Sequence, residues 1–258
     1  MARPERSFVV DRLAVEIYED RASMGIAAAE RAVKRIRQLL MEQDVINVAF
    51  AAAPSQNEFL EALVKAPDID WQRIRAFHLD EYLGLPSDAP QRFRVFLDEH
   101  VFSKADFREV HYLQGDTESP QQEAQRYADL LRQYPLDIAF IGIGENGHIA
   151  FNDPPVADFK DPHLVKIVTL DEKCRQQQVN DGCFPSIDKV PKQALTLTIP
   201  AVMSAKVIYC MVPGKTKAVA VKETIEGEIG THCPATILRH HNAAVLYLDR
   251  DSAAMVKQ

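Results

Sequence analysis

Short apolar segments alternate with amphipathic ones along most of the chain, and this alternation limits the folds open to it. Apolar runs rich in β-branched residues predict buried strands at 45–51, 73–80, 136–144, 206–213 and 243–249. Helical periodicity predicts helices at 21–43, 93–102, 121–134 and 215–227, and residues 194–205 combine a strand with a short helix. Strands that alternate with helices form a parallel sheet. We therefore expect a three-layer α/β fold, with helices on both faces of the sheet.

Length and composition exclude several classes of protein. A chain of 258 residues with 47% hydrophobic residues can form one α/β domain spanning 1–258. Its net charge of −7 argues against a nucleic-acid partner. The apolar runs are too short to span a membrane, and residues 1–10 lack the apolar core of a signal peptide. The cysteines lack CxxC spacing, which indicates free thiols of a cytoplasmic protein; they are Cys174, Cys183, Cys210 and Cys233.

Ligands of parallel sheets bind at the carboxyl ends of the strands, so the polar segments that follow strands are the candidate sites. One of them, residues 142–155, reads GIGENGHIAFNDPP. Its glycine spacing is similar to a dinucleotide-binding fingerprint, but that motif should open a helix, and prolines follow here. A tight turn that needs glycine is a second interpretation.

A third interpretation assigns chemistry to this loop. His148 titrates near neutral pH and can donate or accept a proton. Asp153 could orient its ring, as carboxylates do for catalytic imidazoles, and Asn146 is a polar neighbour. A lone histidine is more often a hydrogen-bonded polar residue without a catalytic role. The glycines and the flanking polar residues together favour the catalytic interpretation.

A second acidic site follows the strand at 73–80. Asp80 and Glu81 come directly after its apolar residues, which places Asp80 at the rim of the sheet. An aspartate after a strand is usually a solvated turn or a helix cap, and without other signals that interpretation would be preferred.

The segments FHLDEYLGL (77–85) and GIGENGHIAFNDPP together resemble the glucosamine-6-phosphate deaminase (isomerase) family. The likeness continues through VTLDEKCRQ, FPSIDKVPKQALTLTI and PGKTKAVAV and covers nearly the whole chain from about residue 45. The related phosphogluconolactonases usually have DER and GHTASLFP at these positions, and this chain has neither. The resemblance implies a Rossmann-like domain with a small lid, for which residues 154–185 are the candidate segment.

The resemblance also implies an activity, namely aldose–ketose isomerisation of a sugar phosphate coupled to loss of ammonia, without metal or organic cofactor. Asp80 matches the family's general base, which moves a proton between C2 and C1. His148 matches the histidine that assists ring opening. Asp153 stands where the family usually has a supporting glutamate, and Asn146 where many members have aspartate. A single carboxylate over two adjacent carbons suits such a proton transfer.

For the substrate's 6-phosphate, Arg175 and Lys215 match the family's phosphate ligands, although on spacing alone each would be a surface cation. The family's first loop usually reads TGGTP, whereas this chain has Ala51-Ala52-Ala53-Pro54-Ser55, which lacks both glycines. Ala52, Ala53, Ser55, Glu81 and Gly147 complete the predicted substrate contacts. Ser55 and Glu58 also form a capping-box pattern that predicts a helix start at Ser55. A carboxylate there would compete with phosphate for the helix N-terminus.

The sequence therefore predicts a glucosamine-6-phosphate deaminase of amino-sugar catabolism. The altered first loop, NDPP in place of the family's NEPG, and Gln91-Arg92 in place of Asn-Ser leave a different sugar open. The alternatives are a related sugar-phosphate isomerase, a 6-phosphogluconolactonase-like hydrolase and a non-catalytic sugar-phosphate-binding regulator. Family members occur as monomers and as hexamers, so a homo-oligomer is compatible with the resemblance.

Overall fold

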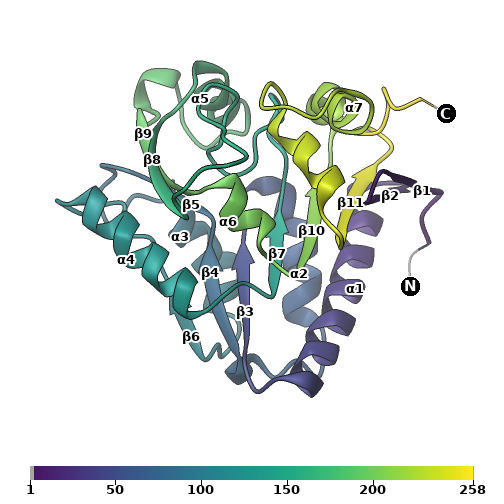
Figure 1. The fold of residues 1–258 in the computed structure, drawn as a ribbon, viewed down its shortest axis with the longest axis horizontal. Coiled ribbons are helices and arrows are strands. Elements are labelled where there is room, and N and C mark those ends of the chain that lie inside the picture. The colour runs from purple at the N-terminus through teal and green to yellow at the C-terminus, as the bar shows by residue number, and fades with distance from the viewer. Residues whose placement is uncertain (1–2, 258) are drawn as a thin grey trace.

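The structure, a computed structural model, describes residues 3–257 and contains a central sheet with helices on both of its faces (Figure 1). In this part of the chain the sheet has eight strands in the order β1-β2-β11-β10-β7-β3-β4-β6. Neighbouring strands run parallel except β1 and β2, which form an antiparallel hairpin. The strands are β1 (Arg6–Val10), β2 (Leu13–Tyr18), β3 (Ile46–Phe50), β4 (Ile74–His78), β6 (Glu109–His111), β7 (Ile138–Ile141), β10 (Val207–Val212) and β11 (Ala244–Asp249).

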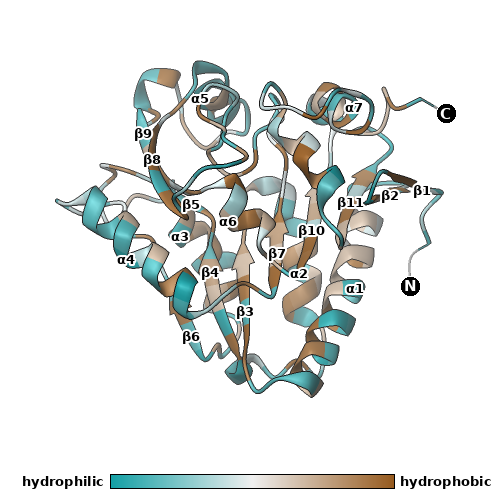
Figure 2. Cartoon of the chain, viewed as in Figure 1, coloured by the Kyte–Doolittle hydropathy of each residue, from teal (hydrophilic) through white to brown (hydrophobic). Residues whose placement is uncertain are grey.

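Side chains of the central strands alternate between two hydrophobic layers, as the two-residue repeat of a strand requires. In β7, Ile138 and Phe140 join the layer under α1 (Arg21–Glu42) and α2 (Asn57–Lys65). Ala139 and Ile141 join the opposite layer, under α4 (Pro120–Gln133), α6 (Ile199–Met203) and α7 (Ala218–Glu226). Figure 2 shows the central strands as the apolar middle of the molecule, with hydrophilic residues on the outer sides of α1 and α4. The predicted three-layer, Rossmann-like fold is confirmed.

A second, smaller sheet lies above one end of the central sheet and was not predicted. It consists of β5 (Asp80–Tyr82), β9 (Gln193–Leu197) and β8 (Val165–Thr169), paired antiparallel in that order. Next to it lies α5 (Glu172–Asn180), which belongs to the predicted lid segment (Figure 1). The strand predicted within 194–205 is β9, and its antiparallel pairing departs from the parallel sheet expected for the chain.

Most predicted elements lie within a few residues of their expected bounds. Predicted helix 93–102 is α3 (Phe93–Leu97), which continues as a π-helical turn over Asp98–Phe102. The predicted helix start at Ser55 is wrong. A 3₁₀ turn begins at Pro54, and Ser55 already lies inside it, because proline suits the first helical position. Glu58 pairs with Arg21 instead of closing a capping box.

Gln258 and the first two residues, which belong to the segment predicted to lack a signal-peptide core, lie outside the described residues. None of the helices in residues 3–257 combines the length and the apolar character that crossing a bilayer requires. All four cysteines are free thiols, as predicted.

The chain order of the strands fixes where a ligand can bind. From β3 the chain continues to β4 and β6 on one side of the sheet, whereas from β7 it continues to β10 and β11 on the other. The two halves therefore diverge between β3 and β7. In open α/β sheets such a switch point leaves a crevice at the carboxyl ends of the strands.

Candidate active site

A pocket occupies this crevice, and the loops that follow four parallel strands form its wall. They are the loops after β3, β4, β7 and β10, together with residues of α1 and α5. Its volume is about 180 Å³. Pockets for drug-sized ligands measure roughly 300–1,000 Å³, so this pocket suits a small sugar better than a dinucleotide. Lining residues are Arg21, Ala51–Gln56, Leu79, Asp80, Phe93, Gly142–Gly144, His148, Ala150, Phe151, Gln177, Gln178, Asp181, Pro213, Gly214, Thr216 and Lys217.

A larger groove of about 810 Å³ lies between α1 and α2, but it contains none of the predicted site residues. It is lined mainly by apolar side chains and by the stems of charged ones, including Lys34 and Arg37. The smaller pocket is therefore the candidate active site.

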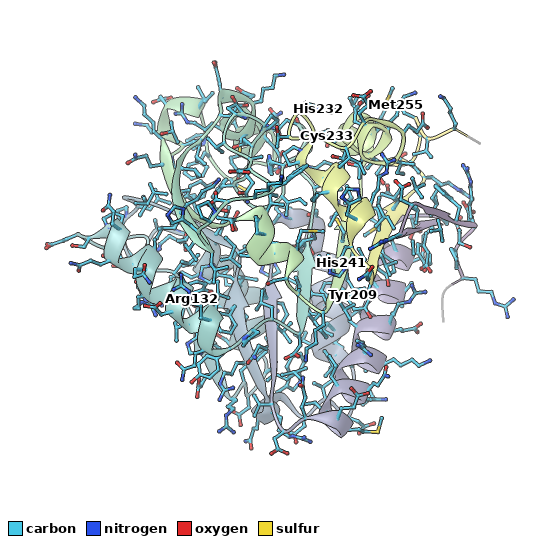
Figure 3. The ribbon with its side chains drawn as sticks, viewed as in Figure 1. Arg132, Tyr209, His232, Cys233, His241 and Met255 are labelled. Carbon is cyan, nitrogen blue, oxygen red and sulfur yellow. The ribbon has the colours of Figure 1, made fainter. Side chains whose placement is uncertain are left out.

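Glycines set the shape of the loop after β7. A Cβ atom on Gly144 would lie 2.1 Å from His148 Cε1, so only glycine allows the imidazole to lie against the backbone. Gly147 has φ of +83°, a conformation that other residues rarely adopt. A Cβ atom there would lie 2.5 Å from Cys233 Sγ, in the segment beside α7 (Figure 3). The loop also contains Ala150 at φ +49°, a strained conformation of the kind that often occurs at active sites.

Two oxygens hold the imidazole of His148. Its Nδ1 lies 2.7 Å from Asn146 Oδ1 and 2.9 Å from Asp153 Oδ1. Because both oxygens can accept, the arrangement favours a proton on Nδ1 and leaves Nε2 for a ligand. Asn146 Nδ2 in turn donates to Asp153 Oδ1 at 2.9 Å. Burial would raise the pKa of Asp153, but the charge of His148 and the hydrogen bonds from His148, Asn146 and Cys174 outweigh burial and lower this pKa.

Asp80 lies at the start of β5, directly after the strand β4, and is only 7% exposed. Burial raises the pKa of its carboxyl group well above its usual range, and the nearby carboxylates of Glu81 and Asp153 raise it further. A carboxylate with a raised pKa is a better proton acceptor once ionised, which suits a general base. Asp80 and His148 both line the pocket, as the catalytic interpretation requires.

Glu81 points away from the pocket and supports the fold. Its carboxylate accepts hydrogen bonds from the backbone N–H groups of Tyr82, Phe93 and Arg94 at 2.9–3.1 Å. It therefore holds the start of α3, and the fully buried Arg92 lies 3.8 Å from it. Glu81 is not among the residues that line the pocket, so its contact with substrate stays a prediction.

The end of the pocket beside the first loop contains two cations, each next to a carboxylate. Lys217 is 6% exposed. Burial lowers the pKa of Lys217, and the nearby carboxylates of Asp181 and Glu145 only partly offset this effect. Arg21, at the start of α1, donates to both oxygens of Glu58 at 2.6 and 2.9 Å and to Pro54 O at 2.9 Å. Lys217 is the more enclosed of the two, because the side chain of Arg21 is 44% exposed.

The structure brings some predicted site residues together and places others elsewhere. Asp80, His148, Ala52, Ala53 and Ser55 line the pocket. Asn146 and Asp153 lie behind the imidazole, and Gly147 shapes the loop.

Neither predicted phosphate ligand lies in the pocket wall. Arg175 donates to the backbone carbonyls of Ile187 and Val190, and Lys215 is exposed. The sequence interpretation missed Lys217. Lys215 and Lys217 are the first and last residues of one 3₁₀ turn, where residues two apart point to different sides. Their spacing could therefore not show which of them faces the pocket. Gln178 and Arg21, also missed, carry no sequence signal that marks them as pocket residues.

Comparison with known proteins decides the family. Residues 19–247 match the family described as glucosamine-6-phosphate isomerases/6-phosphogluconolactonase. The chain belongs to this family. Glucosamine-6-phosphate deaminase from Exiguobacterium sibiricum is 38% identical over 188 residues, 73% of each chain. The deaminase from Listeria monocytogenes serotype 4a is 31% identical over 231 residues, 90% of this chain and 96% of the relative.

Solved structures of the family agree with this assignment. A monomeric glucosamine-6-phosphate deaminase superposes with a TM-score of 0.85 at 30% identity, covering 93% of this chain and 99% of its own. The 6-phosphogluconolactonase from Thermotoga maritima superposes with a TM-score of 0.75 at 22% identity, covering 92% and 99%. The likeness to the lactonase shows a shared fold alone. The likeness to deaminases extends to sequence across most of the chain.

Proposed function

We propose that this protein is a glucosamine-6-phosphate deaminase, which converts glucosamine 6-phosphate and water into fructose 6-phosphate and ammonia. The observation that carries the proposal is the pairing of Asp80 with the His148–Asp153 pair at one pocket. This pairing occurs in a chain at least 31% identical to two deaminases over most of its length. The proposed chemistry uses only proton transfers, the addition of water and the loss of ammonia.

His148 and Asp80 carry out different proton transfers. With Nδ1 held by Asn146 and Asp153, His148 presents Nε2 to deliver a proton to the ring oxygen of the closed sugar. In the open chain, Asp80 removes the proton from C2 and returns it at C1 of the enolamine. Water then replaces nitrogen at C2, and ammonia leaves. The raised pKa of Asp80 makes its carboxylate a stronger base for the carbon-bound proton.

For the 6-phosphate, the proposal assigns Lys217 as the main cation. Lys217 is buried, lines the pocket and lies in the turn after β10. Ser55 and the backbone at Ala52 and Ala53 contact the same pocket and could supply further hydrogen bonds. Arg21 remains a secondary contact, because Glu58 already accepts hydrogen bonds from Nε and Nη2 of its guanidinium. A lysine acts on phosphate as a compact point charge.

Product analysis tests the activity. The purified protein is mixed with glucosamine 6-phosphate, and ammonia and fructose 6-phosphate are measured. We expect the two products to form in equal amounts. A parallel assay with 6-phosphogluconolactone tests the lactonase alternative, and Asp80→Asn provides the inactive control. Binding without turnover of either compound would support the regulator alternative and contradict the proposal.

A pair of lysine variants tests the phosphate site. Lys217→Ala should weaken binding of the phosphorylated sugar by about ten- to a hundredfold, the effect of losing one charge-assisted contact of roughly 1.5–3 kcal/mol. Lys215→Ala removes the same charge two residues away, at an exposed position, and should leave binding within about twofold of wild type. Equal effects of the two substitutions would contradict the assignment of Lys217.

A further inference from the structure

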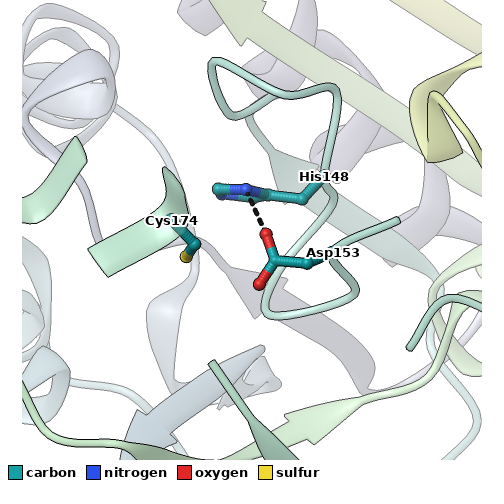
Figure 4. Close-up of side chains that lie close together, drawn as sticks. All are labelled: His148, Asp153 and Cys174. Carbon is teal, nitrogen blue, oxygen red and sulfur yellow. Dashed lines mark ion pairs between the residues drawn. The ribbon is translucent and has the colours of Figure 1, made fainter. Parts of the chain in front are cut away.

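A third side chain completes a set of metal-binding donors at the His148–Asp153 pair. Cys174, on α5, faces the loop that carries the other two residues (Figure 4). A ring nitrogen of His148, a carboxylate oxygen of Asp153 and Cys174 Sγ all lie within 4.8 Å of one another. The three residues are 8%, 0% and 1% exposed, respectively.

The chemistry of this donor set fits one class of cation. Imidazole nitrogen, thiolate sulfur and carboxylate oxygen are the ligands of Zn²⁺, whereas Mg²⁺ prefers oxygen ligands alone. Zinc bonds of about 2.0–2.3 Å in a tetrahedron separate the ligand atoms by roughly 3–4 Å. The donors must therefore shift by only about an ångström. One thiolate and one carboxylate would balance the two charges of the cation.

A second observation points to a ligand here. Asp153 Oδ1 pairs with His148 and Asn146, whereas the buried Asp153 Oδ2 has no hydrogen bond of ordinary geometry among residues 3–257. The Cys174 thiol is the further side chain that lowers the pKa of Asp153. A buried carboxylate oxygen without a partner is costly, and most such atoms are satisfied in native proteins. A cation between Asp153 and Cys174 would satisfy it.

We propose that His148, Asp153 and Cys174 form a reversible inhibitory site for a zinc-type divalent cation, with water from the pocket as the fourth ligand. On binding, the Cys174 thiol loses its proton to solvent. The proton of the His148 ring moves from Nδ1 to Nε2, so that the Nδ1 lone pair reaches the metal. Asp153 binds as the carboxylate, and no electron transfer occurs.

Inhibition follows from the ring nitrogen that the metal occupies. Proton delivery requires Asn146 and Asp153 to hold Nδ1 so that Nε2 faces the pocket, and a metal on Nδ1 takes the place of these two contacts. The metal also removes Asp153 from its role of orienting the ring. This consequence rests on the proposed deaminase function, whereas the binding of metal does not.

Cobalt titration tests the site without an activity assay. Co²⁺ bound by a thiolate gives a near-ultraviolet charge-transfer band and visible bands typical of tetrahedral coordination. We expect the wild-type protein to show these bands with one equivalent of Co²⁺, and Zn²⁺ to abolish them. Cys174→Val and Cys174→Ser should lose the charge-transfer band, and Cys183→Ser, which alters a thiol outside the cluster, should retain it. His148→Gln should weaken Co²⁺ binding although Cys174 is intact.

Inhibition is measured in the wild type and in the cysteine variants. Zn²⁺ should inhibit the wild type, EDTA should reverse the effect, and Mg²⁺ should have none. Loss of the Cys174 ligand should raise the inhibitory Zn²⁺ concentration by more than the ten- to a hundredfold that outer-shell changes typically cause. A charge-transfer band that persists in both Cys174 variants, with their fold verified by circular dichroism, would overturn the proposal. If the wild type shows the bands but no deaminase activity, the metal site stands and the proposed function fails.

Discussion

The folded protein destabilises the ionised form of the Asp80 carboxyl group. Burial and two neighbouring carboxylates raise its pKa, so the ionised form is less stable in the folded protein than in the unfolded chain. The resulting loss of stability is fully present above the folded pKa. It shrinks as the pH falls toward the usual aspartate value. Active-site groups commonly trade stability for function in this way.

The first prediction follows from this trade. Asp80→Asn should lower kcat by several orders of magnitude, because it removes the base, while binding of the sugar phosphate persists. The same variant should melt at a higher temperature than wild type at neutral pH, and the difference should shrink on acidification. Activity assays and thermal melts over a pH series measure both effects. Near-normal turnover would exclude Asp80 as the base, and a lower melting temperature would contradict the role of its buried charge.

The second prediction concerns His148 and its partner. His148→Gln should slow conversion of the closed pyranose more than that of an open-chain analogue, because only the closed ring needs a proton at its oxygen. Asp153→Asn should resemble it more mildly, since Asn keeps the shape but loses the charge that orients the ring. Steady-state rates on the two substrates provide the measurement. Equal losses on both would assign the histidine to another step.

The histidine also affects stability through Asp153. The pKa of Asp153 is lowered in the folded protein, so its ionised form stabilises the fold above the usual aspartate pKa. That stabilisation is lost as the pH falls through the lower, folded pKa. We therefore expect His148→Gln to reduce this acid resistance, which acid-unfolding curves of wild type and variant would reveal.

At the scale of elements, the conformation of the loop after β7 depends on Gly147. The sequence showed this glycine in the motif but not the contact with Cys233 that requires it. Gly147→Ala must both adopt φ +83° and fit a Cβ atom 2.5 Å from Cys233 Sγ. Gly84→Ala is a matched control, because Gly84 has φ +85° with nothing within 4 Å of the added atom. The control should cost about 1–2 kcal/mol from the backbone alone. Gly147→Ala should cost more and should also lower kcat, as measured by denaturant unfolding and activity. Equal unfolding free energies would mean that the loop moves freely away from Cys233.

Local sequence signals predicted elements well and their junctions poorly. The helices at 21–43 and 121–134 were predictable because a long apolar stripe depends on periodicity alone. The capping box at Ser55 was wrong because Pro54 starts the turn one residue earlier, where Ser55 can no longer cap. The two lysines of the turn after β10 differ in burial for the same reason: turn geometry decides the direction of each side chain.

At the scale of the whole molecule, the parallel sheet was predictable, whereas the small antiparallel sheet was not. Asp80–Tyr82 is a three-residue polar strand whose partner, Ala194–Thr196, lies more than a hundred residues away. No local pattern reports such a pairing. The candidate site shows the same contrast between local and long-range signals. Asp80 and His148 lie in sequence motifs and could be predicted to line the pocket. Arg21 and Gln178 reach the pocket from α1 and α5 only through tertiary packing.

The pocket joins four loops of the central sheet to α1 and α5, so a ligand should stabilise the molecule as a whole. At a hundred times its Kd, a ligand adds about 2.7 kcal/mol to the stability. For a chain of this size, that corresponds to a rise in melting temperature of roughly 5–11 °C. The experiment uses Asp80→Asn, which should hold substrate without converting it. Glucosamine 6-phosphate should raise the melting temperature far more than glucosamine at equal concentration, and the added substitution Lys217→Ala should remove most of that difference. If glucosamine alone gives the same rise, the pocket does not recognise phosphate, and the substrate is an unphosphorylated sugar.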